Sequence, residues 1–254
     1  MATVTPKQLE ILLLLYRFRF LNRIQIQKLL NHKDPRRINT WLKNLTDRNI
    51  IGRKYSNKLL VNTKPAVYHL ATKSRNILLG KSGIQEKLLK RVYRDKTRSN
   101  RLVDHCVLTA DIYLFLLSLT KDKKLHFFTK TDLATHYYLP YKRPDAYIAI
   151  EDETTKRYFL EIIDEETPRF MLRSKIAQYV DYADSKNWEK NTSHPFPSIL
   201  IVCPNENIYN FLAKHIAQVL EEEVELEVDF YLCTKEMIRS TEMKVNVWER
   251  VDDI

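Results

Sequence analysis

The segment 143–182 constrains the fold of this chain more than any other stretch. Two apolar runs, Asp145–Glu151 and Arg157–Ile163, are separated by a charged turn, and each has the length and composition of a strand. The run Pro168–Asp184 that follows them predicts a helix. We therefore expect two paired strands followed by a helix, with the second half of the chain organised around them.

Two carboxylates stand at matching places in these two strands. If the strands pair, Asp145 at the start of the first and Glu161 near the end of the second lie at one end of a sheet. Lys175 and Gln178 are one helical turn apart on the helix behind them. Carboxylates so placed are typical of sites that hold Mg²⁺ or Mn²⁺ for phosphodiester hydrolysis. An Asp after Pro is also a common turn residue, so a structural role for the pair is the alternative.

Strands and helices alternate through the rest of the second half. This order, preceded by a long apolar helix, predicts an α/β sheet sandwiched between helices. The further elements are expected at Leu102–Leu119 (helix), Leu125–Thr129 (strand), Ser198–Cys203 (strand), Ile208–Leu220 (helix), Leu226–Cys233 (strand), Lys235–Ser240 (helix) and Lys244–Trp248 (strand).

The net charge of +10 is unevenly distributed. Residues 1–104 hold 24 Lys and Arg against 6 Asp and Glu, whereas the remaining 150 residues hold 18 against 26. A strongly basic half attracts polyanions, because binding releases the counterions condensed on a phosphate backbone. Basic side chains that are merely solvated on helix surfaces would give the same count.

Three helices are expected in the basic half. They begin at Thr5-Pro6, at Arg23 and at Asp34-Pro35, and the third runs to about Arg48. In the third helix, apolar residues at i, i+3, i+4 and i+7 form one stripe from Ile38 to Leu45. The order predicts a helix-turn-helix whose polar face contacts base edges and phosphates of double-stranded DNA. The predicted DNA-binding residues of this face are Arg36, Arg37, Asn39, Thr40, Lys43 and Asn44.

A strand-like run at Ile50–Lys54, a basic loop and a return strand at Ala66–Leu70 predict a wing after the third helix. Arg53, Lys54 and Lys58 are the wing residues expected to contact DNA. We therefore expect a two-domain α+β chain, with a winged helix-turn-helix domain at 1–82, a basic helical linker at 83–101 and an α/β nuclease-like domain at 102–254. A winged helix that contacts protein instead of DNA is the alternative for the first domain.

Several other classes of protein are disfavoured. The three cysteines lie far apart without metal-ligand spacing, which argues against a disulfide framework or a zinc site. No signal peptide is evident, and the longest apolar run is too short for a membrane span. We expect an intracellular, cytoplasmic protein. With only three glycines, a nucleotide-binding loop is not expected.

The pair Pro144-Asp145, followed by Glu161 at the end of an apolar strand, resembles the PD-(D/E)XK nuclease fold. That resemblance implies that Asp145 and Glu161 hold a divalent metal and that a lysine two residues after the glutamate assists the attacking water. This chain has Ile163 at that position. Lys175 is the candidate substitute, and Gln178 begins a match to the QxxxY pattern of some members.

The whole chain is similar to the replication-relaxation family. The resemblance rests on Pro144-Asp145-Ala146, Leu160–Asp164 and Lys175–Tyr179, preceded by a basic winged helix and a long apolar helix. Family members commonly show Glu-x-Asp where this chain has Glu161-Ile162-Ile163-Asp164, one residue longer, so either Ile163 or Asp164 takes the position of the family aspartate. A shift of one residue would reverse which face of the strand it occupies.

Three functions are consistent with these patterns. The first is a DNA-binding protein of a plasmid or similar element, with a nuclease-like domain that is catalytically silent or weak. Its implied partners are double-stranded DNA, a relaxase or replication protein, and a second copy of the chain in a homodimer. The second is a Mg²⁺- or Mn²⁺-dependent endonuclease that uses Asp145, Glu161 and Lys175. The third is a transcriptional repressor.

Overall fold

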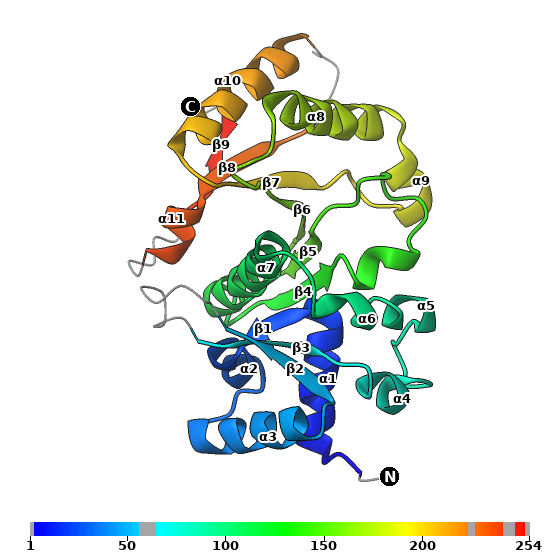
Figure 1. Cartoon of the computed structure of the whole chain (residues 1–254). Coiled ribbons are helices and arrows are strands. Elements are labelled where there is room, and N and C mark those ends of the chain that lie inside the picture. The colour runs from blue at the N-terminus through cyan, green and yellow to red at the C-terminus, as the bar shows by residue number, and fades with distance from the viewer. Residues whose placement is uncertain (1–2, 56–64, 223–226, 241–246, 252–254) are drawn as a thin grey trace. The chain divides into compact units, whose positions relative to one another are not determined.

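The computed structural model describes residues 3–55, 65–222, 227–240 and 247–251 and divides the chain into two compact units, Met1–Leu114 and Phe115–Ile254 (Figure 1). The division lies inside helix α7, Asn100–Leu119, whereas the sequence placed the start of the second domain at residue 102. The Gln25 amide donates hydrogen bonds to the Val107 carbonyl oxygen (2.8 Å) and to Asp111 Oδ1 (2.7 Å). These bonds hold the first turns of α7 in unit 1.

Unit 1 begins with the three predicted helices. Thr5 and Asn22 each form a capping box, so that side chain and backbone satisfy each other at the starts of α1 and α2. Asp34 Oδ1 accepts a hydrogen bond from Arg36 N (2.8 Å) at the start of α3. The helices are α1 (Pro6–Phe18), α2 (Arg23–Leu29) and α3 (Pro35–Asp47).

A three-stranded antiparallel sheet completes the core of unit 1. Strands β2 (Ile51–Lys54) and β3 (Val67–Leu70) were predicted, whereas β1 (Phe20–Asn22) was not. The strand order is β1-β3-β2. Three residues are too few to show a period of two in sequence, so β1 is recognisable only through its pairing with β3. Helix α4, Ser74–Leu78, follows the sheet.

The basic segment 83–101 packs against the C-terminal end of α1. It forms the short helices α5 (Glu86–Leu89) and α6 (Val92–Asp95). Asp95 is buried and pairs with Arg19 at 2.6 Å, and the Arg91 guanidinium donates to the Tyr16 carbonyl oxygen. Burial lowers the pKa of Arg91 to about 10. An ion pair and a charged hydrogen bond thus make this segment part of unit 1.

Unit 2 is built on a six-stranded mixed sheet in the order β4-β5-β6-β7-β8-β9. Strands β4, β5 and β6 are antiparallel, β6, β7 and β8 are parallel, and β9 is antiparallel to β8. The chain is therefore an α+β protein. The strands are β4 (Lys124–Thr129), β5 (Ala146–Glu151), β6 (Thr155–Ile162), β7 (Ser198–Cys203), β8 (Phe230–Thr234) and β9 (Glu249–Arg250).

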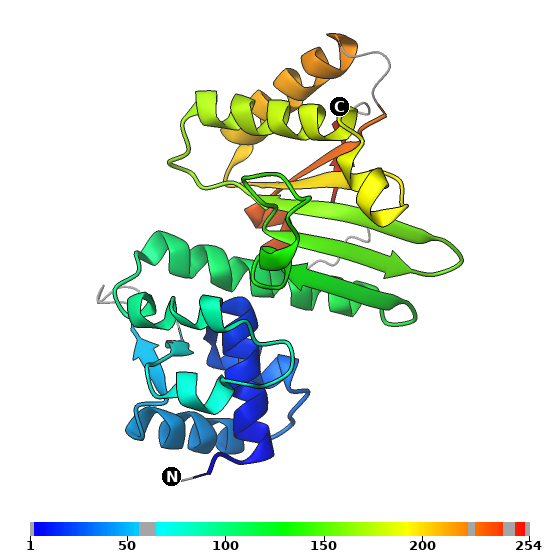
Figure 2. The same ribbon diagram turned by 90° about the vertical axis from the view of Figure 1, so that its right-hand side faces the viewer.

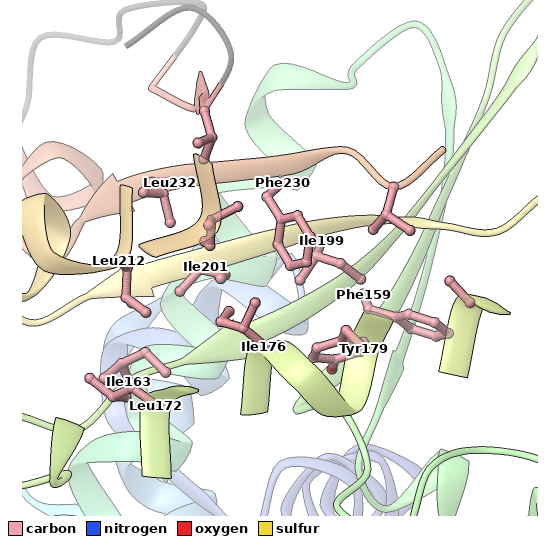
Figure 3. Close-up of a cluster of buried hydrophobic side chains, with 14 of the residues drawn as sticks. Phe159, Ile163, Leu172, Ile176, Tyr179, Ile199, Ile201, Leu212, Phe230 and Leu232 are labelled. Atoms are coloured by element: carbon pink, nitrogen blue, oxygen red, sulfur yellow. The ribbon is translucent and has the colours of Figure 1, made fainter. Parts of the chain in front are cut away.

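Helices α8 (Arg169–Asp184) and α10 (Glu206–Glu222) form the crossovers between the parallel strands and lie along one face of the sheet (Figures 1 and 2). The 3₁₀ turn Asp132–Thr135 and the helices α9 (Asn187–Thr192) and α11 (Lys235–Arg239) complete the unit. The core between the sheet and these helices includes Phe159, Ile176, Tyr179 and Ile201, all at most 2% exposed (Figure 3). Residues 226 and 244–246 of the last two predicted strands lie outside the described residues.

The sequence was expected to hold no apolar run long enough for a membrane span, but helix α7 is long and apolar enough, by length and composition alone, to cross a membrane. Core helices meet the same criterion. The two hydrogen bonds from Gln25 show that its N-terminal half takes part in the packing of unit 1.

Gly52 is required by the packing of the small sheet. It lies opposite the buried His69, and a Cβ at this position would come within 2.4 Å of the imidazole ring. We expect Gly52→Ala to lower the free energy of unfolding by about 1–3 kcal/mol, since the ring or the backbone has to move. Urea unfolding followed by circular dichroism measures this.

Gly80→Ala is the matched control, because a Cβ there meets no atom within 4 Å and the cost is limited to the positive φ of 76°. In a His69→Ala background the cost of Gly52→Ala should shrink. An equal cost in both backgrounds would show that the imidazole is not the obstacle.

Candidate functional site

The outer face of α3 is polar, basic and exposed. Its apolar residues Ile38, Leu42 and Leu45 are fully buried, so the opposite face points to solvent. No acidic residue lies between Pro35 and Thr46. All six residues predicted for this face are exposed: Arg36, Arg37, Asn39, Thr40, Lys43 and Asn44.

These six residues differ in whether their side chains contact other residues of unit 1. Asn44 Oδ1 accepts hydrogen bonds from Gln8 Nε2 (2.9 Å) and Arg48 (3.3 Å), so Asn44 joins α3 to α1. The Arg37 guanidinium lies 6.0 Å from the centre of the Trp41 ring. Thr40 Oγ1 donates to a backbone oxygen of its own helix. Arg36 and Lys43 form no side-chain ion pair with the described residues.

The predicted wing residues also differ in whether contacts within unit 1 hold them. Arg53 is exposed on β2, with its guanidinium 4.6 Å from the centre of the Tyr55 ring. Lys54 Nζ donates to the Arg98 carbonyl oxygen at 2.6 Å and is half-buried. That bond holds Lys54 within unit 1. Lys58 lies outside the described residues.

In unit 2 the structure brings Asp145 and Glu161 together. The register of β5 and β6 pairs Ala146 with Leu160, so the two carboxylates occupy the next position outward on adjacent strands. Asp145 is buried, and its Oδ2 accepts a hydrogen bond from Ile162 N at 2.9 Å. Lys130 Nζ lies 3.4 Å from Asp145 Oδ1. The backbone and a lysine therefore both hold this carboxylate.

Glu161 is buried between the sheet and α8. Its Oε2 forms an ion pair with Lys175, and its Oε1 accepts a hydrogen bond from the Tyr179 hydroxyl at 2.5 Å. Burial raises the pKa of Glu161, the charge of Lys175 opposes this, and the charge of Asp145 adds to it. Burial also raises the pKa of Tyr179, so its hydroxyl keeps the proton that it donates.

Ile163 fills the position two residues after Glu161. β6 ends at Ile162, and Ile163 N, directly after it, donates to the Val202 carbonyl oxygen at 2.9 Å. The Ile163 side chain is 5% exposed and packs in the core beside Leu172 (Figure 3). Asp164 lies past the end of the strand. Lys175 thus supplies an ammonium near the carboxylates, from the helix and not from the strand.

Gln178 does not join the carboxylates. Its Nε2 donates to the Lys142 carbonyl oxygen at 3.0 Å and ties α8 to the segment before β5. Tyr179 and Lys130 contact the carboxylates without having been predicted to do so. The i, i+4 spacing of Lys175 and Tyr179 is a sequence signal that Tyr179 lies on the same side of the helix as Lys175. The contact of Lys130 with Asp145 depends on the pairing of β4 with β5, which no local pattern reveals.

The site does not fit a divalent metal well. Among the described residues, no three His, Cys, Asp or Glu side chains gather as a possible metal site. The oxygens of Glu161 already accept from a lysine and a tyrosine in a buried position. Mg²⁺ binds through free carboxylate oxygens and keeps several water ligands, so its site must be open to water. An ion at Glu161 would have to displace both Lys175 and Tyr179.

Comparison with known proteins gives one match. A family model described as Replication-relaxation matches residues 12–199, which include α3, both carboxylates and all of α8. No curated protein matches the chain.

The Glu161–Lys175 pair generates a stability prediction. Lys175→Met leaves a buried carboxylate without its cation, so we expect the free energy of unfolding to fall by about 2–4 kcal/mol, less than for a fully buried pair because Lys175 keeps 22% side-chain exposure. Tyr179→Phe should cost about 1.5–3 kcal/mol, because the lost hydrogen bond is to a buried charged group. Urea unfolding measures both.

The double variant Glu161→Gln with Lys175→Met removes the unpaired charge and should be more stable than Lys175→Met alone. If Lys175→Met is as stable as the unsubstituted chain, the ion pair does not support unit 2.

Proposed function

The chain belongs to the replication-relaxation family, and from that premise we propose that it is a DNA-binding protein of a plasmid or similar mobile element. It acts in replication, DNA relaxation or mobilisation. Unit 1 binds double-stranded DNA, and unit 2 is a nuclease-like module without hydrolytic activity. The observation that carries the proposal is the acid-free, exposed polar face of α3.

The topology of unit 1 supports a winged helix. Its elements follow in the order helix, strand, helix, helix, strand, strand, and the sheet order β1-β3-β2 places the last two strands side by side. In such domains the third helix enters the major groove, and the two last strands flank a wing. Here the corresponding elements are α3 and the pair β2 and β3.

The side chains of α3 suit this task. Arginine and lysine contact phosphates and guanine edges, and asparagine and threonine hydrogen-bond to base edges. Arg36 and Lys43 lie seven residues apart and so share one face of the helix. Asn44 is the exception within the face, because its amide oxygen is taken by Gln8 and Arg48. We assign Asn44 to positioning α3 rather than to contacting DNA.

The contacts of Glu161 support a silent nuclease-like module. Hydrolysis in PD-(D/E)XK nucleases requires a metal between the two carboxylates and a lysine free to orient water. In this chain Lys175 instead neutralises Glu161, and Ile163 occupies the usual lysine position within the core. The same contacts stabilise the packing of α8 on the sheet. Unit 2 is then available for a further copy of the chain, a relaxase or a replication protein.

Mobility shifts across a series of salt concentrations test the DNA-binding role of α3. Arg36→Ala and Lys43→Ala should each weaken binding to a mixed-sequence duplex several-fold. Each lost phosphate contact should also make the negative slope of log affinity against log salt shallower by about 0.9, because fewer counterions are released.

Lys214→Ala is the matched control, since it removes an exposed lysine from α10 of unit 2. Its affinity and salt slope should equal those of the unsubstituted chain. Unchanged affinity and salt slope in both α3 variants would refute the proposal.

The adjacency of Asp145 and Glu161 favours one other candidate, a metal-dependent endonuclease. We expect no nicking of supercoiled plasmid in Mg²⁺ or Mn²⁺ beyond that of Asp145→Asn, a variant that keeps an oxygen to accept the bond from Ile162 N. Gel electrophoresis of the plasmid gives the readout. Metal-dependent nicking that disappears in Asp145→Asn would establish the endonuclease and exclude a silent module.

A further inference from the structure

The segment between β4 and β5 displays two tyrosines on a fixed support. Tyr137 and Tyr141 are 86% and 96% exposed, the two most exposed large hydrophobic residues among those described. Leu139 between them is 6% exposed and belongs to the core of unit 2. The Tyr138 ring packs 6.1 Å from that of the buried Trp188. Buried neighbours thus anchor the backbone from which the two exposed rings project.

This segment lies beside α8. Gln178 Nε2 donates to the Lys142 carbonyl oxygen at 3.0 Å, which places the backbone of Lys142 next to the helix. Met171, Lys175 and Gln178 occupy positions i, i+4 and i+7 and therefore share one side of α8. Met171 is 42% exposed, and Phe170 beside it is 71% exposed. Exposed apolar and aromatic side chains are therefore present both on the segment and on the first turn of α8.

The charge of this surface is opposite to that of its unit. Unit 2 is acidic as a whole, yet residues 133–144 and residues 167–180 contain no Asp or Glu. The surface carries Lys142 and Arg143, and the two neighbouring carboxylates are countered by Lys130 and Lys175. Lys142 and Arg143 thus add positive charge to a surface whose two neighbouring carboxylates are already countered.

We propose that this surface, formed by residues 137–143 and the exposed side of α8 from Phe170 to Gln178, binds a single-stranded polynucleotide. Proteins that bind single strands combine aromatic side chains, on which bases stack, with cations that follow the backbone. Tyr137 and Tyr141 supply stacking platforms, and Lys142 and Arg143 supply the cations. Duplex DNA offers no exposed base faces, so this surface discriminates against it.

This site goes beyond the duplex-binding role proposed for α3 and does not depend on it. The two lie in different units and use different chemistry. An element that undergoes replication or relaxation exposes single strands, so a protein with both sites can hold a duplex and the strand released from it.

Fluorescence anisotropy with labelled oligo(dT) and oligo(U) tests the proposal on the full chain. Tyr141→Ala should weaken binding by roughly five- to hundredfold, the effect of losing one stacked base, and Tyr137→Ala should act in the same direction. Tyr141→Phe keeps the ring and should bind like the unsubstituted chain. Because Tyr141 is 96% exposed, thermal unfolding should be unchanged in both of its variants.

Lys142→Ala should lower the salt slope for the single strand by about 0.7, whereas the control Lys156→Ala, at the far end of β5 and β6, should leave it unchanged. None of these variants should change duplex affinity, while Arg36→Ala should, which separates this proposal from that for α3. Equal affinity for oligo(dT) and oligo(U) would mean that the site accepts both single-stranded DNA and RNA. Tighter binding of one would identify that polynucleotide as the ligand.

Two results would overturn the proposal. One is the absence of oligo(dT) and oligo(U) binding at low salt. The other is binding that Tyr141→Ala leaves unchanged, which would assign the exposed tyrosines to contacts with a protein.

Discussion

A buried carboxylate must be paired, and the packing of unit 2 follows from how Glu161 meets that requirement. Transfer of a charge into a core costs several kcal/mol unless a cation and hydrogen bonds compensate for it. Lys175 and Tyr179, one turn apart on α8, provide both. Because they share one side of the helix, their contacts set the rotation and register of α8 on the sheet. The apolar packing of Ile163 against Leu172 and Ile176 depends on that register.

The two polar regions of the chain therefore differ in their availability. Around Glu161 every strong contact is already made within unit 2. On α3, Arg36 and Lys43 project from a helix whose other face is fully buried, and they are held by little else in unit 1. Charged groups that are solvated and unpaired are able to exchange water for phosphate, whereas saturated ones first have to break internal bonds. This contrast supports the proposal that α3 binds DNA and that Glu161 has a structural role.

Long periodic elements were predictable from the sequence, and short or contact-dependent ones were not. The helices α1, α3, α8 and α10 and the strands β4 to β7 appear within a few residues of their expected bounds. Strand β1 and helix α9 are too short to show a period, and only their tertiary partners reveal them. The basic segment 83–101 resembled a linker because its charge suggested solvent, although Asp95 is buried in an ion pair with Arg19 and half-buried Arg91 donates to the Tyr16 carbonyl oxygen. Charge in a sequence does not reveal its partner.

The sequence by itself determined the α+β class, the family and the face of α3 that meets solvent, since each follows from periodicity, charge or a local motif. It also placed Asp145 and Glu161 at one end of the sheet. Only the tertiary structure decided what these carboxylates contact. Lys130 reaches Asp145 through the pairing of β4 with β5, and Lys175 reaches Glu161 through the packing of α8. Contacts between residues distant in sequence depend on how elements pack, and local patterns carry no record of that packing.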